Sequence, residues 1–333
     1  MIAPPAIEVL PAEQMGYSGT ERLVGQLSSG FNKRGHDTTV IASRGSYLLG
    51  VEIVETVPAR YGGIQHEETH FQAYKDFLKS EEFDWVDDHT HFFRSHQLGL
   101  KNISWSIHDS LPLENPPVRV PMYARSKAHA EYLSELWKCN VDYIYNGVQL
   151  DHYRYEENKG DYLLFFGRCN SYKGSIAFAE MCERLGVRGV MAGEDSELRG
   201  VPLETVKQIL IIANRYPKLH YLGRVSETKK IELLSKAKAL VSPLIEPYFP
   251  VFDLTLVESQ ATGTPVICTD RGASREVIRD GETGFVVRNV DEIPDYVDRL
   301  NEIDPKACRR NAERFSVERM VNKYIKSYGN MVG

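Results

Sequence analysis

The sequence predicts an α/β fold with two doubly wound domains, each built on a parallel sheet. Helical and strand-like apolar patterns alternate along almost the whole chain, which is typical of helices layered on parallel strands. The 333 residues are about twice the length of a typical domain. The alternation starts afresh near residue 150 with a continuous apolar run, so we expect the two domains to join there.

In the first half, an apolar residue recurs at every fourth position from Leu23 to Phe31 and predicts a helix over 19–34. Gly35 follows where glycine often ends a helix. The other elements predicted in this half are a strand at 38–43, a helix at 72–80, strands at 83–89 and 102–108, and a helix at 128–138.

The second half begins with the run 162–167, which is apolar throughout and therefore typical of a buried parallel strand. The last helix, 316–331, carries an apolar stripe at helical spacing that is too extensive to be left in solvent. Between them the sequence predicts helices at 174–186, 206–216 and 228–237, strands at 187–193, 219–223 and 239–243, a helix ending near Ala261, and strands at 264–270 and 280–287.

The composition excludes several classes of protein. With 42% hydrophobic and 26% charged residues, the chain is not intrinsically disordered, and no apolar run approaches the roughly 18 residues of a membrane-spanning helix. Forty basic and 46 acidic side chains give a net charge of −6, which argues against a nucleic-acid partner. Five cysteines without a CxxC pair indicate reduced thiols, and the first residues lack a basic region, so we expect a cytoplasmic protein without a secretory signal.

Three residues ahead of the first helix are candidates for contacting an anion. Gly16, Ser18 and Gly19 lie between a very short first strand and the helix over 19–34. The backbone N–H groups of such a turn, together with the positive end of the helix, favour a phosphate. A plain helix-entry turn explains the same residues equally well.

A second anion site is predicted where the strand 162–167 ends. Arg168 follows this strand, and Lys173 comes five positions later at the start of the next helix. Arginine offers a planar fork and lysine a point charge, a combination suited to clamping a diphosphate. Two ordinary surface charges on a solvated loop are the alternative.

Two further side chains stand out by their position. His108 ends the strand 102–108, and ligands of open α/β sheets collect at the carboxyl ends of strands. His89 occupies the same kind of position on the previous strand. Glu258 falls in a short helix ahead of a buried strand, where an unpaired carboxylate is costly. It therefore needs partners, which either the hydroxyls of a ribose or nearby backbone amides would supply.

One segment matches a zinc motif. His66, Glu67 and His70 form the pattern H-E-x-x-H, which in zinc proteases places two histidine ligands and a general base on one helix. Here the flanking residues are charged on several sides, and the other histidines show no fixed zinc spacing. We expect the solvated start of a helix, with a zinc hydrolase site as the alternative.

Five segments, in this order, resemble the glycosyltransferases of GT-B fold, specifically those of the retaining family 4, or group 1, type. Together they extend over nearly the whole chain. The first contains the family's Thr-Glu-Arg and Arg-Gly-His-Asp sequences, and the fourth resembles its donor loop from Gly-Arg to Lys-Gly. The five segments are 16–43, 83–90, 144–153, 163–175 and 256–278.

The resemblance implies two Rossmann-like domains that face a central cleft, with residues 1–148 as the acceptor domain, completed by a helix within 316–333 that packs on it, and 149–315 as the nucleotide-sugar donor domain. The catalytic residues it implies are His108, which contacts the transferring sugar, and Arg168 and Lys173, which hold the diphosphate. The donor-binding residues it implies are Gly16, Ser18 and Gly19 at the phosphates, Arg224 and Val225 near the base, Glu258 at the ribose, and Glu246, Asp253, Leu254 and Thr255 towards the sugar.

The sequence departs from the family pattern at three places. Pro250 stands where the family has the first glutamate of its E-x7-E pattern, and Asp253 stands where a glycine is usual. Glu246 comes early, in a loop longer than is typical, so either Glu246 or Asp253 is the candidate to replace the missing acid. In the first half, Asp87 replaces the first histidine of the strand pattern Val-His-x-His.

The implied reaction transfers a sugar from a UDP- or GDP-sugar to an acceptor hydroxyl, with retention of configuration and without a metal or other cofactor. The acceptor is a small molecule, a glycan or a lipid-linked compound, the last of which would bring the protein to the inner face of a membrane. No pair of carboxylates is placed for a double displacement, so we expect a front-face route. A non-catalytic nucleotide-sugar-binding protein and the zinc hydrolase are the alternatives from other classes.

Overall fold

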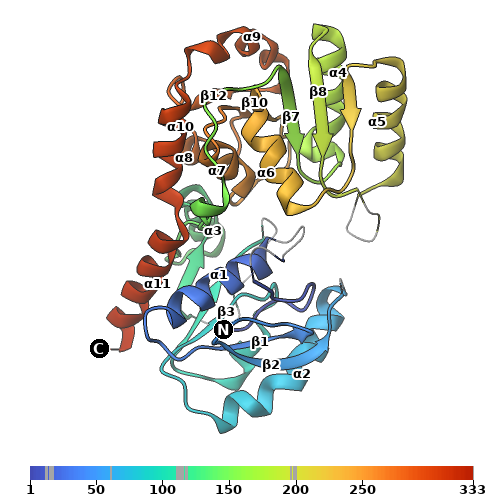
Figure 1. Ribbon diagram of the computed structural model, residues 1–333. Coiled ribbons are helices and arrows are strands. Elements are labelled where there is room, and N and C mark those ends of the chain that lie inside the picture. The colour runs from blue at the N-terminus through green and yellow to red at the C-terminus, as the bar shows by residue number, and fades with distance from the viewer. Residues whose placement is uncertain are drawn as a thin grey trace. The chain divides into compact units, whose positions relative to one another are not determined.

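Figure 1 shows the computed structural model of the protein, which describes residues 1–11, 14, 19–60, 62–109, 116, 119–195, 197 and 201–332. The chain divides into two compact units. The first unit comprises Met1–Gly147 together with Val317–Gly333, and the second comprises Val148–Ser316. The last helix of the chain therefore belongs to the same unit as the first 147 residues.

The first unit is built on short parallel strands. Its helices and strands are α1 (Thr20–Asn32), β1 (Thr39–Arg44), β2 (Glu52–Pro58), α2 (Gly63–Ser80), β3 (Val86–Asp88), β4 (Ile103–Ser106), β5 (Met122–Ala124), α3 (Lys127–Trp137), β6 (Asp142–Tyr143) and α11 (Val317–Val332). One sheet pairs β1 with β2, and the other has the order β3-β4-β5-β6. Ile2 bridges Ile41 of β1 and Asp88 of β3, so the very short first strand is a single residue that links the two sheets.

The second unit has a single six-stranded sheet in which all pairs are parallel, with the order β12-β11-β10-β7-β8-β9. Its elements are β7 (Tyr162–Phe166), α4 (Ser175–Leu185), β8 (Arg188–Ala192), α5 (Leu203–Arg215), β9 (Leu219–Tyr221), α6 (Glu227–Lys236), β10 (Ala239–Ser242), α7 (Leu254–Ala261), β11 (Val266–Thr269), α8 (Ser274–Val277), β12 (Gly284–Val287), α9 (Pro294–Val297) and α10 (Pro305–Ala312).

The strand order of this sheet reverses between β7 and β10. From β7 the chain moves outward through β8 and β9, and it then returns to the other side of β7 to add β10, β11 and β12. In doubly wound sheets such a switch point is where ligands bind, at the carboxyl ends of the strands. We therefore expect a ligand site at the loops that follow β7 and β10.

The predicted α/β class with parallel sheets is confirmed, and α2 and β2 are among the elements that differ from the prediction. The helix predicted at 72–80 is α2, which begins earlier, at Gly63. The sequence pattern does not predict β2, because this strand pairs with β1 alone and exposes Glu52 and Glu55. Charged residues on an edge strand interrupt the apolar signal by which buried strands are recognised.

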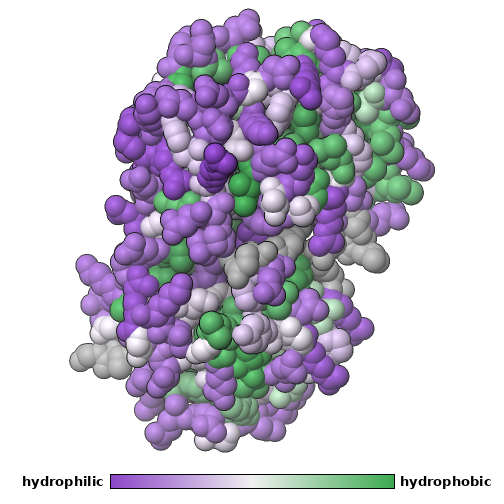
Figure 2. Space-filling model, viewed as in Figure 1, coloured by the Kyte–Doolittle hydropathy of each residue, from purple (hydrophilic) through white to green (hydrophobic). Residues whose placement is uncertain are grey.

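The outer face of α5 exposes apolar side chains, which form part of a hydrophobic area in Figure 2. They include Leu203, Leu210 and Ile211, and they lie on the helix that follows β8 rather than on the loops after β7 and β10. Among the described residues, no helix is both long and apolar enough to cross a membrane.

α11 packs closely on α1 within the first unit. Val321 and Tyr324 of α11 are completely buried. A Cβ atom built on Gly30 of α1 would lie 2.5 Å from Cγ2 of Val321. Glycine at this position therefore lets the two helices approach each other.

We expect Gly30→Ala to lower the free energy of unfolding of the first unit by about 1–3 kcal/mol, because the added methyl group overpacks this contact. Alanine is otherwise more favourable in a helix than glycine by about 1 kcal/mol. The matched control is therefore Gly329→Ala in α11, where a Cβ meets no described atom within 4 Å, and this variant should keep or raise stability.

All three tryptophans lie in the first unit, so urea unfolding followed by tryptophan fluorescence measures both variants. Equal stability of Gly30→Ala and the unchanged protein would contradict the close packing of α1 and α11.

Candidate functional site

The loops after β7 and β10 meet through their backbones at the switch point. Gly174 ends the first loop with a φ of +72°, and a Cβ atom on it would lie 1.9 Å from the carbonyl oxygen of Pro243, the first residue after β10. The N–H group of Ile245 donates a hydrogen bond of 2.9 Å to the carbonyl of Tyr172. A side chain at position 174 would push these loops apart, so glycine sets their distance.

Lys173 and Asp253 form an ion pair across these loops. Lys173 Nζ lies 3.3 Å from Asp253 Oδ2, and both side chains are 14% exposed. The same ammonium group lies 4.9 Å from the ring centroid of Tyr248, a cation–π contact. Asp253 also accepts a 3.2 Å hydrogen bond from the N–H group of Thr255 and so caps α7. Lys173 is thus held beside the positive end of a helix.

Arg168 lies on the same loop as Lys173. It follows Gly167 at the end of β7 and is half-buried. Between the two cations, Asn170 accepts a 3.1 Å hydrogen bond from the Lys173 N–H group. Asn170 is buried, and its Nδ2 group has no hydrogen-bond partner within the described part of the chain. Two cations and an amide donor thus lie along six consecutive residues.

The two acids that the sequence leaves as alternatives have different surroundings. Glu246 is 71% exposed and pairs with the guanidinium group of Arg271. Asp253 is 14% exposed and pairs with Lys173. Of the two, Asp253 is therefore the one that the fold brings to a residue of the predicted diphosphate clamp.

Glu258 is buried, and its protein partners are two side chains rather than the backbone amides that were one expectation. Its Oε1 atom accepts hydrogen bonds from the Tyr153 hydroxyl at 2.6 Å and from Lys230 Nζ at 3.0 Å. Lys230 also lies 2.8 Å from Glu227 Oε1. Among the described residues, Oε2 of Glu258 has no hydrogen-bond partner, which leaves this oxygen for a ligand.

Lys230 and Tyr153 are the residues of this group that sequence reasoning does not single out. A signal for Lys230 is present in the sequence, because it falls on the apolar face of α6 with Leu233 and Leu234, where all three are buried. A lysine on such a face needs an acid partner. Nothing in the sequence marks Tyr153, which lies 105 positions from Glu258.

The remaining donor-binding candidates of the second unit lie at the same carboxyl edge of the sheet. Arg224 is exposed and Val225 is half-buried, and both follow β9. Leu254 and Thr255 form the first turn of α7 and are half-buried.

In the first unit, Gly16 and Ser18 lie outside the described residues, and Gly19 directly precedes α1. His108 follows β4 and is half-buried, and its Nε2 atom lies 3.0 Å from Nδ1 of His89. Burial, assisted by the nearby charge of Arg125, holds the pKa of His108 well below its usual value. His108 is therefore neutral at physiological pH.

The H-E-x-x-H segment is not the solvated helix start that its charged flanks suggest. His66, Glu67 and His70 are all buried on α2. Glu67 accepts hydrogen bonds of 3.0 Å from the backbone N–H groups of His91 and Phe92, and His70 Nδ1 lies 2.6 Å from the Thr56 hydroxyl. In the described ranges no three His, Cys, Asp or Glu side chains are grouped so as to hold a metal ion. The segment thus joins α2 to β2 and to the loop after β3.

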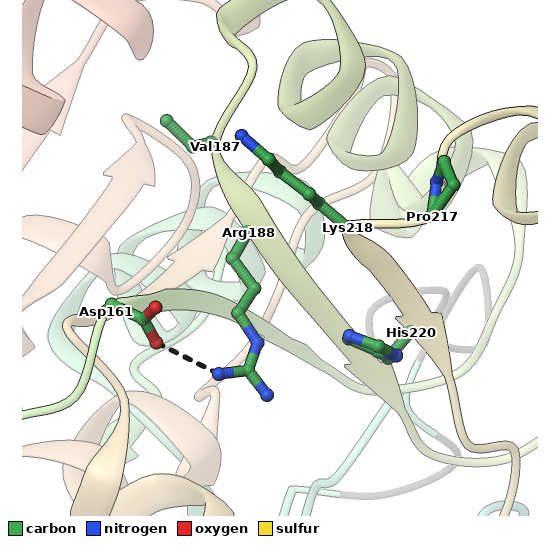
Figure 3. A pocket seen from close by; sticks show the side chains of 6 residues that line it. All are labelled: Asp161, Val187, Arg188, Pro217, Lys218 and His220. Carbon is green, nitrogen blue, oxygen red and sulfur yellow. Dashed lines mark hydrogen bonds and ion pairs between the residues drawn. The ribbon is translucent and has the colours of Figure 1, made fainter.

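A surface pocket of about 400 Å³ lies at the opposite edge of the second unit's sheet (Figure 3). Its lining residues precede or lie on β7, β8 and β9, and they are Asp161, Val187, Arg188, Pro217, Lys218 and His220. Arg188 Nη1 is 3.1 Å from Asp161 Oδ1. Since most of these residues lie at the amino ends of parallel strands, the pocket is separate from the switch-point loops, and we do not assign the site to it.

Two family models match the chain. The model described as Glycosyltransferase Family 4 matches residues 17–152, and the model described as Glycosyl transferases group 1 matches residues 160–303. Among curated proteins, the D-inositol 3-phosphate glycosyltransferase of Mycobacterium tuberculosis is 26% identical over 220 residues. That match covers 59% of this chain and 45% of the relative, so the chain spans about half the length of the curated relatives it matches.

Solved structures of glycosyltransferases share the fold. The sucrose-phosphate synthase from Thermosynechococcus elongatus has a TM-score of 0.77 at 18% identity, covering 99% of this chain and 98% of that one. A glycosyltransferase involved in avilamycin A biosynthesis has a TM-score of 0.74 at 22% identity, covering 99% and 97%. HepE from Anabaena, in complex with UDP and glucose, has a TM-score of 0.72 at 14% identity, covering 97% and 100%. These likenesses confirm the predicted GT-B fold with two Rossmann-like domains.

We expect Lys230→Met to lower the free energy of unfolding of the second unit by about 3–5 kcal/mol, because it leaves the buried Glu258 carboxylate without its cation. The matched control is Lys229→Met. Lys229 is 43% exposed and pairs with Glu232, and exposed pairs contribute at most about 1 kcal/mol. Urea unfolding followed by far-UV circular dichroism measures both, and equal stabilities of the two variants would refute the Lys230–Glu258 pair.

Proposed function

Since the chain belongs to the group 1, family 4-type glycosyltransferases, we propose that it transfers a sugar from a nucleoside diphosphate sugar to an acceptor hydroxyl. The observation that carries this proposal is the Lys173–Asp253 pair at the switch point, with Arg168 on the same loop. Two cations beside the first turn of a helix suit a diphosphate. The complex of HepE with UDP and glucose supports a nucleotide-sugar donor.

We propose UDP or GDP as the nucleotide, with Glu258 at its ribose. Oε1 of Glu258 is occupied by Tyr153 and Lys230, which fix the carboxylate plane and leave Oε2 to accept from a ribose hydroxyl. Arg224 and Val225, which follow β9, are proposed for the base. Lys173 and Arg168 then take the diphosphate that joins the nucleoside to the sugar.

The proposed reaction retains the configuration at the anomeric carbon by a front-face route. The bond from this carbon to the diphosphate oxygen breaks, and its electron pair stays on that oxygen. The acceptor oxygen bonds to the carbon on the same face, and the acceptor proton passes to an oxygen of the departing diphosphate. Lys173, Arg168 and the positive end of α7 stabilise the negative charge that develops on the departing diphosphate. We propose that these groups suffice without a metal ion.

The acceptor is proposed to be a hydroxyl of a small molecule, a glycan or a lipid-linked compound. The curated relative carries the name D-inositol 3-phosphate glycosyltransferase, which supports a polyhydroxylated acceptor as the first class to assay. With a lipid-linked acceptor the reaction would take place at a membrane surface.

The clamp is tested by removing Lys173. We expect Lys173→Ala to weaken binding of UDP or GDP at least about tenfold, because a charge-assisted hydrogen bond contributes about 1.5–3 kcal/mol. Lys218→Ala, in the pocket at the opposite sheet edge, is the control and should bind normally. Calorimetric titration measures both. Normal affinity in Lys173→Ala, or an equal loss in Lys218→Ala, would exclude the switch-point site, whereas nucleotide binding without transfer to any acceptor would indicate a non-catalytic binding protein.

The role of Asp253 gives a second prediction. Asp253→Asn removes the carboxylate that pairs with Lys173 and competes with the diphosphate for its ammonium group. We therefore expect the bare nucleoside diphosphate to bind more tightly to this variant. Glu246→Gln alters an exposed acid paired with Arg271 and should leave this affinity unchanged. Titrations with UDP and GDP compare the two variants. Weaker binding in Asp253→Asn would show that Asp253 supports the nucleotide instead of competing with it.

A further inference from the structure

One arginine of the second unit joins parts of the chain that are far apart in the sequence. Arg309 lies on α10 and is half-buried. Its Nη1 atom donates to the carbonyl oxygens of Ala261 at 2.5 Å, Tyr153 at 2.9 Å and Leu150 at 3.3 Å. Ala261 ends α7, whereas Leu150 and Tyr153 lie near the start of the unit. Arg309 thus connects a helix of the candidate donor site to a distant segment.

The two parts that Arg309 connects also meet at Glu258. This acid lies on α7, about one helical turn before Ala261. The Tyr153 hydroxyl donates to Oε1 of Glu258 at 2.6 Å. Tyr153 is therefore fixed relative to α7 at two points, through its backbone carbonyl by Arg309 and through its hydroxyl by Glu258.

α10 has its own attachment to α7, so Arg309 projects from a fixed support. The two helices pack against each other (Figure 1). Asn311 of α10 is buried, and its Nδ2 atom donates to Oε1 of Gln260 on α7 at 2.6 Å and to the carbonyl of Val277 at 2.7 Å. Because these bonds do not involve Tyr153, they fix α10 independently of the segment that Arg309 holds.

A cap for α7 is the simplest role for this arginine. The last carbonyls of a helix have no partners within the helix, and a positive charge near them is favourable. Such a cap needs only the carbonyl of Ala261. The additional bonds to Leu150 and Tyr153 bring the same amino group to the segment that carries the partner of Glu258. This indicates a role beyond capping.

Tyr153 determines which oxygen of Glu258 is open to a ligand. Tyr153 and Lys230 both donate to Oε1, which leaves Oε2 without a hydrogen-bond partner in the described part of the chain. The other acid near the Tyr153 hydroxyl, Glu227, is farther away, with its Oε1 atom at 3.4 Å. An ammonium group alone attracts either carboxylate oxygen equally. A correctly placed Tyr153 hydroxyl is therefore needed to keep Oε2 away from Lys230.

We propose that Arg309 is a positioning residue for ribose recognition, which holds Tyr153 beside Glu258 and so keeps Oε2 open to a ribose hydroxyl of the nucleotide. The substrate class that follows is a nucleoside diphosphate with intact ribose hydroxyls, as distinct from its deoxy forms. The inference rests on the proposed function for the position of the ribose, and on the contacts of α10 and α7 for the role of Arg309.

The test compares the binding of UDP with that of its 2′,3′-dideoxy analogue, which lacks both ribose hydroxyls, by calorimetric titration. GDP and dideoxy-GDP serve as the pair if UDP does not bind. We expect the unchanged protein to prefer the ribonucleotide at least about tenfold, because the analogue loses a hydrogen bond to a charged group. In Arg309→Met, which removes every donor of this side chain, the preference should disappear, while affinity for the analogue stays unchanged.

The matched control is Arg310→Met, at the next position of α10. Arg310 is 64% exposed and lies 3.5 Å from Asp304, so this variant should keep the full preference. A residue that only stabilises α7 would change the affinities for both nucleotides alike and leave their ratio intact. An unchanged ratio in Arg309→Met, or an equal loss of preference in Arg310→Met, would therefore overturn the inference.

Two further outcomes are informative. If Arg309→Met does not fold, Tyr153→Phe decides, since it removes the hydroxyl through which Arg309 acts. A lost preference in that variant supports the inference, and an undiminished one overturns it. If the unchanged protein binds neither UDP nor GDP, the proposed function fails. If it binds the ribonucleotide and the dideoxy analogue equally well, the nucleotide site stands, and the ribose role of Glu258 and Arg309 is refuted.

Discussion

The close approach of the Gly174 backbone to the carbonyl of Pro243 is the constraint on which the candidate donor site depends. It brings the loop after β7 against the loop after β10, at the one place in the sheet where the strand order reverses. Lys173, next to Gly174, then faces Asp253 at the start of α7. Any residue with a side chain at position 174 would separate these charges. The chemistry of the second unit thus follows from a packing requirement of its backbone.

Both units bury a carboxylate, and hydrogen bonds from distant parts of the chain offset the unfavourable free energy of removing its charge from water. Glu258 uses Tyr153 and Lys230, and Asp87 uses the hydroxyls of β4 and α11. In each case the donors hold the acid in one orientation, and at Glu258 they leave Oε2 without a hydrogen-bond partner among the described residues. Burying a charge lowers the stability of the fold. Such an arrangement is therefore expected where function requires a polar group in a fixed orientation.

The sequence predicts those parts of the fold and the site that depend on local pattern. Buried parallel strands and the positions just after them are recognisable, which is why the sequence alone singles out Arg168 and Lys173 as candidates. The partners of Glu258 are not, because Tyr153 and Lys230 reach it through tertiary structure. The H-E-x-x-H segment shows the converse error: charged flanks suggest a solvated helix, yet hydrogen bonds to Thr56 and to the loop after β3 bury it. Burial depends on what packs against a helix, and the flanks do not show this.

The central claim is that the loops after β7 and β10 hold the diphosphate of a nucleotide donor. A crystal structure of the protein grown with UDP or GDP tests it most directly. The account predicts the diphosphate within hydrogen-bond distance of Lys173 Nζ and a ribose hydroxyl on Oε2 of Glu258. A nucleotide seated instead in the pocket lined by Arg188, Lys218 and His220, with the loops after β7 and β10 free of it, would contradict the account.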